Sequence, residues 1–198
     1  MTIERLLTPD MDKSFGRVAS KFTGIVHSGT HIDAPLHMLG EKAKAIGDYP
    51  SDKFVGDAIL VDMRDKVPAK DIMPEDLEKS VGSIIREGDI LLIRTDMGKE
   101  YANPHRYFEE SPYLTPAASQ WCVDKKVKLV GVDFYHHKGS ADVEFSGSKV
   151  LFENDILTLT YLDHLWEISS ERFTVMALPI KIEAVESSWA RAVAIEET

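Results

Sequence analysis

Short apolar runs rich in β-branched residues recur along the chain, and polar or turn residues bound each of them. Runs of this length favour buried strands over helices. Strands are predicted in this way at residues 57–63, 88–95, 127–134, 154–162, 172–183 and 189–197. Pro179 lies inside the fifth run and predicts an edge or a bulge there, because proline cannot donate a ladder hydrogen bond.

Helical signals are fewer. Residues 73–81 have Pro74 near their start and acidic residues in the first turn, as helix N-termini prefer. Residues 114–127 offer Thr115 as an N-cap and proline at the first helical position. A third, short helix is expected at residues 161–168. The pattern predicts an α/β chain that is richer in strand than in helix, and because no repeat or linker divides it, a single domain over residues 1–198.

Composition limits the partners and the cellular compartment that are expected for this domain. The chain has 198 residues, of which 43% are hydrophobic, so a sizeable core can form. Its net charge of −10 argues against a nucleic-acid partner, which needs a basic face. No apolar run is long enough to span a membrane. The single cysteine, Cys122, cannot form an internal disulfide, so a cytoplasmic protein with a small-molecule partner is expected.

The stretch HSGTHIDAPLH holds the clearest chemical signal. It contains three of the seven histidines of the chain and one aspartate. In an extended segment alternate side chains share a face, so His27, His31 and Asp33 are expected to point the same way, with Gly29 leaving space between the imidazoles. Two imidazoles and one carboxylate suit Zn²⁺, Mn²⁺ or a related divalent ion, and three protein ligands leave a position open for water.

His37 follows the same stretch beyond Pro35, which is expected to turn the chain out of the strand. Its ordinary pKa suits a general base for a water and then a general acid for a leaving group. The alternative is a polar turn that is rich in histidine, because any of these histidines alone would more often be a surface residue. Four ligand-type side chains in one short segment favour the metal site.

These residues resemble the signature His-x-Gly-Thr-His-x-Asp-x-Pro-x-His of the cyclase-like metal-dependent hydrolases, which include bacterial kynurenine formamidase and isatin hydrolase. Later segments, among them DKFVGDAILVDMRD and VLFENDILTLTYLDHLWEI, follow the family in order. The resemblance implies a swivelling β/β/α fold, an α/β class with a mixed-strand, barrel-like core and outer helices. It also implies a homodimer or homotetramer, His27, His31 and Asp33 as metal ligands, His37 as the acid/base, and hydrolysis of an amide-type bond in an N-formyl aryl amine, a small lactam or a lactone.

The chain departs from the family in the second half of the metal site. The alignment puts Ser148 where a histidine is expected and Thr160 where a glutamate is expected, and hydroxyls are poor ligands for a divalent ion. His136 and His137 could supply replacement donors, or they could lie in a solvated loop. Two hypotheses therefore stay open: a metal-dependent hydrolase, and a degenerate family member that binds a metal or small ligand without turnover.

Overall fold

The computed structural model describes residues 1–6, 19–135 and 147–197. Within these ranges seven strands close into a barrel with the order β10-β11-β3-β9-β8-β6-β4. The neighbouring strands β4, β6, β8 and β9 are parallel to one another. The strands β3, β10 and β11 are antiparallel to each of their neighbours in the barrel. The barrel strands are β3 (His31–Asp33), β4 (Val55–Asp62), β6 (Ile90–Arg94), β8 (Leu129–Val132), β9 (Leu157–Thr160), β10 (Arg172–Pro179) and β11 (Ser187–Ile195).

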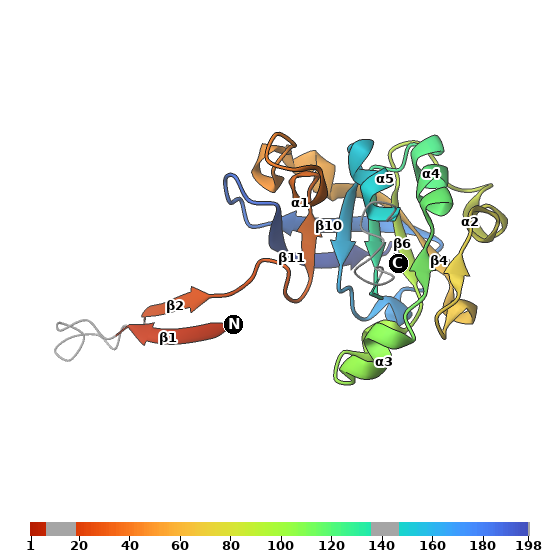
Figure 1. Ribbon diagram of the computed structural model, residues 1–198. Coiled ribbons are helices and arrows are strands. Elements are labelled where there is room, and N and C mark those ends of the chain that lie inside the picture. The colour runs from red at the N-terminus through yellow and green to blue at the C-terminus, as the bar shows by residue number, and fades with distance from the viewer. Residues whose placement is uncertain (7–18, 136–146, 198) are drawn as a thin grey trace.

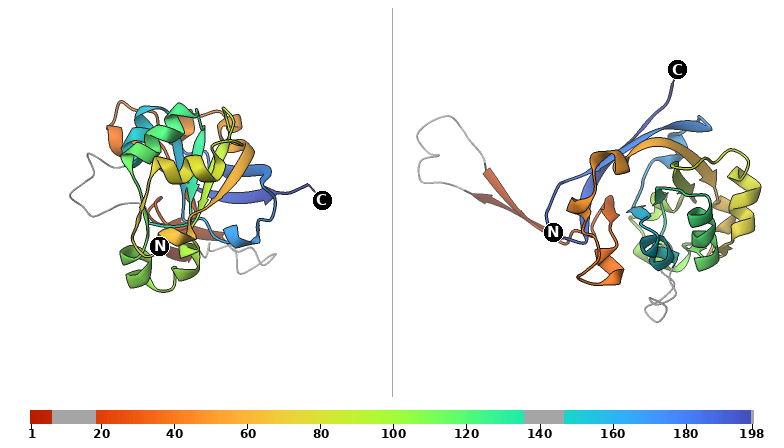
Figure 2. Two further views of the ribbon diagram at one scale, coloured as in Figure 1. Left: turned by 90° about the vertical axis from the view of Figure 1, so that its right-hand side faces the viewer. Right: turned by 90° about the horizontal axis from the view of Figure 1, so that it is seen from above.

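Helices cover one side of this barrel, and the β10–β11 hairpin lies on another side (Figure 1, Figure 2). The α-helices are α1 (Leu36–Leu39), α2 (Pro74–Val81), α3 (Pro104–Glu109), α4 (Pro116–Asp124) and α5 (Gly147–Glu153). Short 3-10 turns lie at Ile46–Asp48, Ser51–Phe54, Arg64–Lys66, Met97–Glu100 and Leu165–Glu167. Two small strand pairs complete the fold, β1 (Thr2–Leu6) with β2 (Ala19–Thr23) and β5 (Asp71–Ile72) with β7 (Tyr113–Leu114).

Two apolar cores lie on opposite faces of the barrel wall. The inner core fills the barrel with side chains such as Ile32, Leu92 and Leu159. The outer core packs the helices against the alternate residues of the same strands, and it includes Leu77 of α2 and Val61 of β4. This division follows from the two-residue period of a strand, which sends neighbouring side chains to opposite faces.

The β1–β2 hairpin projects from the body of the molecule as an arm that none of the sequence patterns predicted (Figure 1). All five β2 residues are exposed, and Phe22 contacts Trp189 of β11 with ring centroids 4.7 Å apart. The chain leaves β2 and enters the HSGTHIDAPLH stretch four residues later, so the arm is attached directly beside that stretch.

The predicted fold class and all six predicted strands are confirmed, with ends that differ by a few residues. An edge or a bulge was predicted at Pro179. Pro179 pairs with Ala190 of β11 but lies beyond Met176, where the pairing of β10 with β4 ends, so this end of β10 is a local edge. The prediction of a third helix at residues 161–168 is wrong. This segment contains only a single 3-10 turn at Leu165–Glu167, and His164 before it has a left-handed backbone conformation. No helix in the described ranges is long and apolar enough to cross a membrane.

Candidate metal centre

The HSGTHIDAPLH stretch changes conformation twice. Gly29 has φ of +67°, a left-handed value that suits glycine, and regular strand pairing begins only at His31. The expectation of one extended segment from His27 to Asp33 is therefore wrong in its first half, because the bend at Gly29 interrupts the strand period. Pro35 turns the chain into α1, as expected, and this short helix carries His37.

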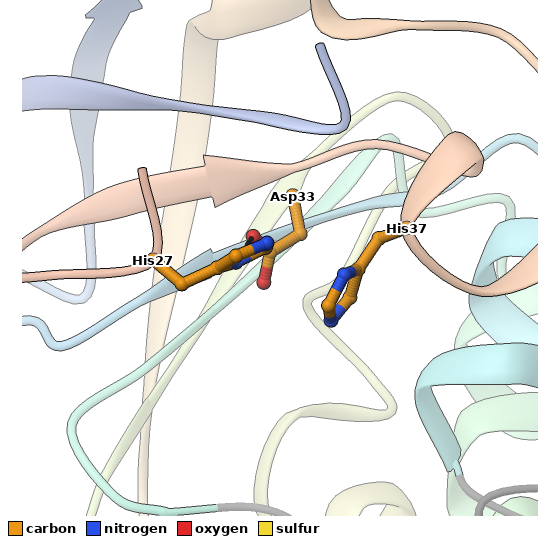
Figure 3. A group of neighbouring side chains, drawn as sticks. All are labelled: His27, Asp33 and His37. Carbon is orange, nitrogen blue, oxygen red and sulfur yellow. Dashed lines mark ion pairs between the residues drawn. The ribbon is translucent and has the colours of Figure 1, made fainter. Parts of the chain in front are cut away.

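Asp33 lies at the centre of the cluster that this path creates. It is 5% exposed, and its Oδ1 is 2.9 Å from Nδ1 of His27 and 3.3 Å from Nε2 of His31. His27, Asp33 and His37 each offer a ligand atom within 4.8 Å of the others (Figure 3). His27 thus lies next to Asp33 because the chain bends at Gly29, and not because the two residues share one face of a strand as predicted. His31 contacts the same carboxylate oxygen from β3.

The second nitrogen of each imidazole is already occupied. Nε2 of His27 is 3.1 Å from Oε1 of Glu186, and Nδ1 of His31 is 2.6 Å from the carbonyl oxygen of Gly29. Carboxylate and carbonyl oxygens only accept, so these two nitrogens carry the protons. In the neutral imidazoles the free lone pairs then lie on Nδ1 of His27 and Nε2 of His31, the two nitrogens nearest Asp33, and a second ring nitrogen engaged in this way is typical of metal-binding histidines.

This donor set fits a divalent cation. Among the described residues Asp33 Oδ1 has no aligned hydrogen-bond partner, although it is buried and lies close to both imidazoles. Burial opposes the ionisation of Asp33, but the neighbouring imidazoles of His27 and His31 outweigh it and hold the pKa of Asp33 well below its usual range. Hydrogen bonds from the two imidazoles thus stabilise the ionised carboxylate. A divalent cation would take the place of these protons, and nitrogen with oxygen donors suits zinc or a similar ion.

His37 approaches the cluster from the exposed side. Its ring centroid is 4.2 Å from that of His27, and the residue itself remains exposed. Partial desolvation lowers the pKa of His37, and the opposing charge of Asp33 does not compensate. His37 is therefore neutral near pH 7 and can accept a proton, while its position also lets it serve as a ligand.

The two departures from the family signature lie in different surroundings. Thr160 pairs with His31 in the β3–β9 ladder, and its Oγ1 is 3.0 Å from Nε2 of His31, so the position expected for glutamate does border the cluster. Ser148 of α5 is buried and lines a small cavity of about 10 Å³ with Val130 and Thr158. His136 and His137 lie outside the described residues.

Sequence reasoning missed Glu186 and Tyr161. Glu186 lies between β10 and β11, 159 residues from His27, and no local motif marks it. Tyr161 follows Thr160, and its ring centroid is 5.7 Å from that of His31. In the sequence, Tyr161 is marked only by its position next to Thr160. Its proximity to His31 becomes visible only when β9 pairs with β3.

Comparison with known proteins identifies the family to which the chain is similar. The family model Cyclase, described as "Putative cyclase", matches residues 3–137. A kynurenine formamidase of Bacillus thuringiensis is 30% identical over 176 residues, which cover 87% of this chain and 78% of the relative. A kynurenine formamidase of Salinibacter ruber is 29% identical over 168 residues, with 84% and 74% covered.

Solved structures give the same assignment of the fold. A potential metal-dependent hydrolase with cyclase activity is 25% identical, with a TM-score of 0.76 over 99% of this chain and 87% of that chain. An isatin hydrolase bound to the product analogue thioisatinate has a TM-score of 0.87 over 99% and 81%, at 21% identity. At that identity the likeness concerns the fold alone.

Proposed function

The chain belongs to the Cyclase family, and from this premise we propose that it is a metal-dependent hydrolase that cleaves an amide-type bond or the related ester bond of a lactone. One observation carries the proposal: a buried carboxylate, Asp33, faces nitrogens of two imidazoles whose other nitrogens are already engaged. His27, His31 and Asp33 would hold the ion. Zn²⁺ or Mn²⁺ fits this donor set.

A bound divalent ion would act as a Lewis acid toward a carbonyl group and lower the pKa of a nearby water. The chain itself supplies the path of the proton. His37, neutral near pH 7 and exposed beside His27, takes a proton from the attacking water. It then returns this proton to the departing atom, the nitrogen of an amide or the ring oxygen of a lactone, which leaves as an amine or a hydroxyl group.

The proposed substrates are an N-formyl aryl amine, a small lactam or a small lactone. The curated relatives are named kynurenine formamidases, and isatin hydrolases share the fold. Binding without turnover is the competing function, and the replacement of two expected ligands by Ser148 and Thr160 is the observation that favours it.

One experiment separates the two functions. The protein is purified without a metal-chelating tag, its metal content is measured by elemental analysis, and hydrolysis of N-formyl aryl amines, lactams and lactones is assayed with added Zn²⁺ or Mn²⁺. We expect bound metal and turnover of at least one of these substrates. Bound metal without turnover of any substrate supports the binding function. If the protein binds no metal after reconstitution, metal-dependent hydrolysis and metal binding are both contradicted.

His37 is tested by His37→Ala, with His105→Ala as the control because His105 is an exposed histidine on α3, outside the cluster. We expect His37→Ala to lose turnover by about 100-fold or more, a typical contribution of general acid–base catalysis, and to keep its metal. Loss of metal from this variant would instead make His37 a ligand.

The proposed assembly is a homodimer or homotetramer. The outward face of the β10–β11 hairpin carries exposed apolar side chains, at Met176, Leu178, Val193 and Ile195. Light scattering with size-exclusion chromatography should show an oligomer, and Met176→Glu with Val193→Lys should weaken it; a monomeric wild-type protein would contradict the proposal.

A cytoplasmic setting is also proposed, supported by the free, buried thiol of Cys122.

A further inference from the structure

Tyr161 has a backbone conformation that is unfavourable for a bulky residue. It directly follows β9 and has φ of +56°, in the left-handed region where bulky L-residues are uncommon. Residues held in such regions often cluster at functional sites. The strain therefore directs attention to what the side chain of Tyr161 does.

The surrounding chain fixes this conformation from both sides. The hydroxyl of Thr30 donates a hydrogen bond of 2.7 Å to the carbonyl oxygen of Tyr161. The next residue, Leu162, donates its N–H to the carbonyl of Val132 at 3.1 Å and accepts the hydroxyl of Tyr101 at 2.6 Å. The backbone at Tyr161 therefore has little freedom to move, as the precise placement of a functional side chain requires.

Aromatic contacts then orient the ring toward the cluster. The ring of Tyr161 is stacked on Tyr101 at 5.6 Å between centroids, packs against Tyr107 at 5.6 Å, and lies 5.7 Å from the ring of His31. The residue is half-buried. It therefore forms the junction between a group of tyrosines and the candidate metal ligands.

The phenol of Tyr161 remains a proton donor in this place. An ordinary phenol has a pKa of about 10 and keeps its proton near pH 7. A neutral phenol can donate one hydrogen bond to an oxygen that gains negative charge. The neighbouring Thr160 hydroxyl is already 3.0 Å from Nε2 of His31.

We propose that Tyr161 is a catalytic residue whose hydroxyl donates a hydrogen bond to the carbonyl oxygen of the substrate while that oxygen is negatively charged. This inference rests on the proposed hydrolase function. The water oxygen bonds to the carbonyl carbon, the carbonyl π pair moves to the oxygen, and the water proton passes to His37. The pair then returns, the carbon–nitrogen bond breaks, and the nitrogen takes the proton from His37. Tyr161 keeps its own proton throughout.

The test compares Tyr161→Phe with Tyr107→Phe. Both variants remove one hydroxyl from the same group of tyrosines and keep the ring. Within the described residues, however, Tyr107 makes no ring contact or hydrogen bond with His31, Asp33 or His37. On a substrate that the wild type turns over, we expect Tyr161→Phe to lower kcat by about 100-fold, the scale of one lost oxyanion donor. KM, metal content and melting temperature should stay near wild-type values, and Tyr107→Phe should keep the wild-type kcat.

An unchanged kcat in Tyr161→Phe overturns the inference, and so does a change confined to KM, because that would mean a stacking role only. Reduced metal content in Tyr161→Phe also overturns it, since the hydroxyl would then serve the ligands.

A second measurement separates this inference from the proposed function. If the wild type turns over none of the substrates, the hydrolase function fails, and phenylphosphonate, a stable tetrahedral anion on an aromatic ring, is titrated into the zinc-loaded proteins. We expect Tyr161→Phe to bind it about 10-fold or more weakly than wild type, the effect of losing one hydrogen bond to a charged group. Equal affinity in both proteins, or no binding to the wild type, overturns the inference.

Discussion

The inner and outer faces of β3 and β9 differ in chemistry although the same short segments supply both. Ile32, Leu157 and Leu159 point into the barrel and are fully buried in its apolar core. Their neighbours His31 and Asp33 on β3 lie on the other face and are 3% and 5% exposed. Both faces are therefore buried, but only one of them is apolar.

This difference shows how a strand can combine rigidity with reactivity. The apolar face contributes about 25 cal/mol per Å² of buried apolar surface to the free energy of folding. The polar face must satisfy or pair each buried group, because an unpaired buried charge is strongly unfavourable. Around Asp33 that pairing is provided by histidines, and in the proposed function by a cation. Four predictions test this contrast, in order of decreasing effect.

The largest effect is expected from Asp33→Asn. The amide cannot supply the negative charge that joins His27 and His31, so metal affinity should fall by more than about 100-fold, beyond the range for loss of a group that only supports a ligand. Calorimetric titration with Zn²⁺ measures this. Asp62→Asn, at an exposed aspartate paired with Arg64, is the matched control, and equal zinc affinity in both variants would contradict the metal centre.

Leu159→Ala tests the apolar face of β9. Leu159 is fully buried, so truncation should reduce the free energy of unfolding by about 2–5 kcal/mol through lost burial and a residual cavity. Urea denaturation measures this loss, while zinc affinity of the folded protein should remain near that of the wild type. A large change in zinc affinity without loss of stability would show that the two faces are not independent.

Glu186→Gln is expected to have an intermediate effect on the polar face. The carboxylate of Glu186 accepts from Nε2 of His27 and orients the other nitrogen to Asp33. Removal of its charge should weaken zinc binding by about 10- to 100-fold, as for other groups that support a ligand. Glu183 lies exposed in the same connection between β10 and β11 and, within the described residues, makes no hydrogen bond or ion pair with the cluster. Glu183→Gln should therefore bind zinc like the wild type, and similar losses in both variants would point to a general charge effect.

The smallest effect is expected from Ser148→Ala. Within the described part of the chain the buried hydroxyl of Ser148 has no hydrogen-bond partner, so its removal should change the free energy of unfolding by about 1 kcal/mol or less, with stabilisation expected. Zinc affinity should not change. A marked loss of zinc affinity would show that Ser148 serves the metal centre after all.

Local patterns accounted for six of the seven barrel strands, for α2 and α4, and for the ligand-type residues. A two-residue period, a proline at the first helical position such as Pro74 and an N-cap such as Thr115 depend on neighbours in sequence, so they can be found without a structure. The bend at Gly29 escaped this reasoning because glycine is compatible with both extended and left-handed backbone.

The sequence by itself determined that His27, His31, Asp33 and His37 lie close together, because eleven consecutive residues leave them little room to separate. Only the tertiary structure decided which groups surround them. Glu186 and Thr160 come from segments more than 120 residues away, and Tyr161 reaches His31 through the same pairing of β9 with β3. The physical reason is that ladder pairing across a closed barrel sets which distant residues become neighbours, and no local periodicity carries that information.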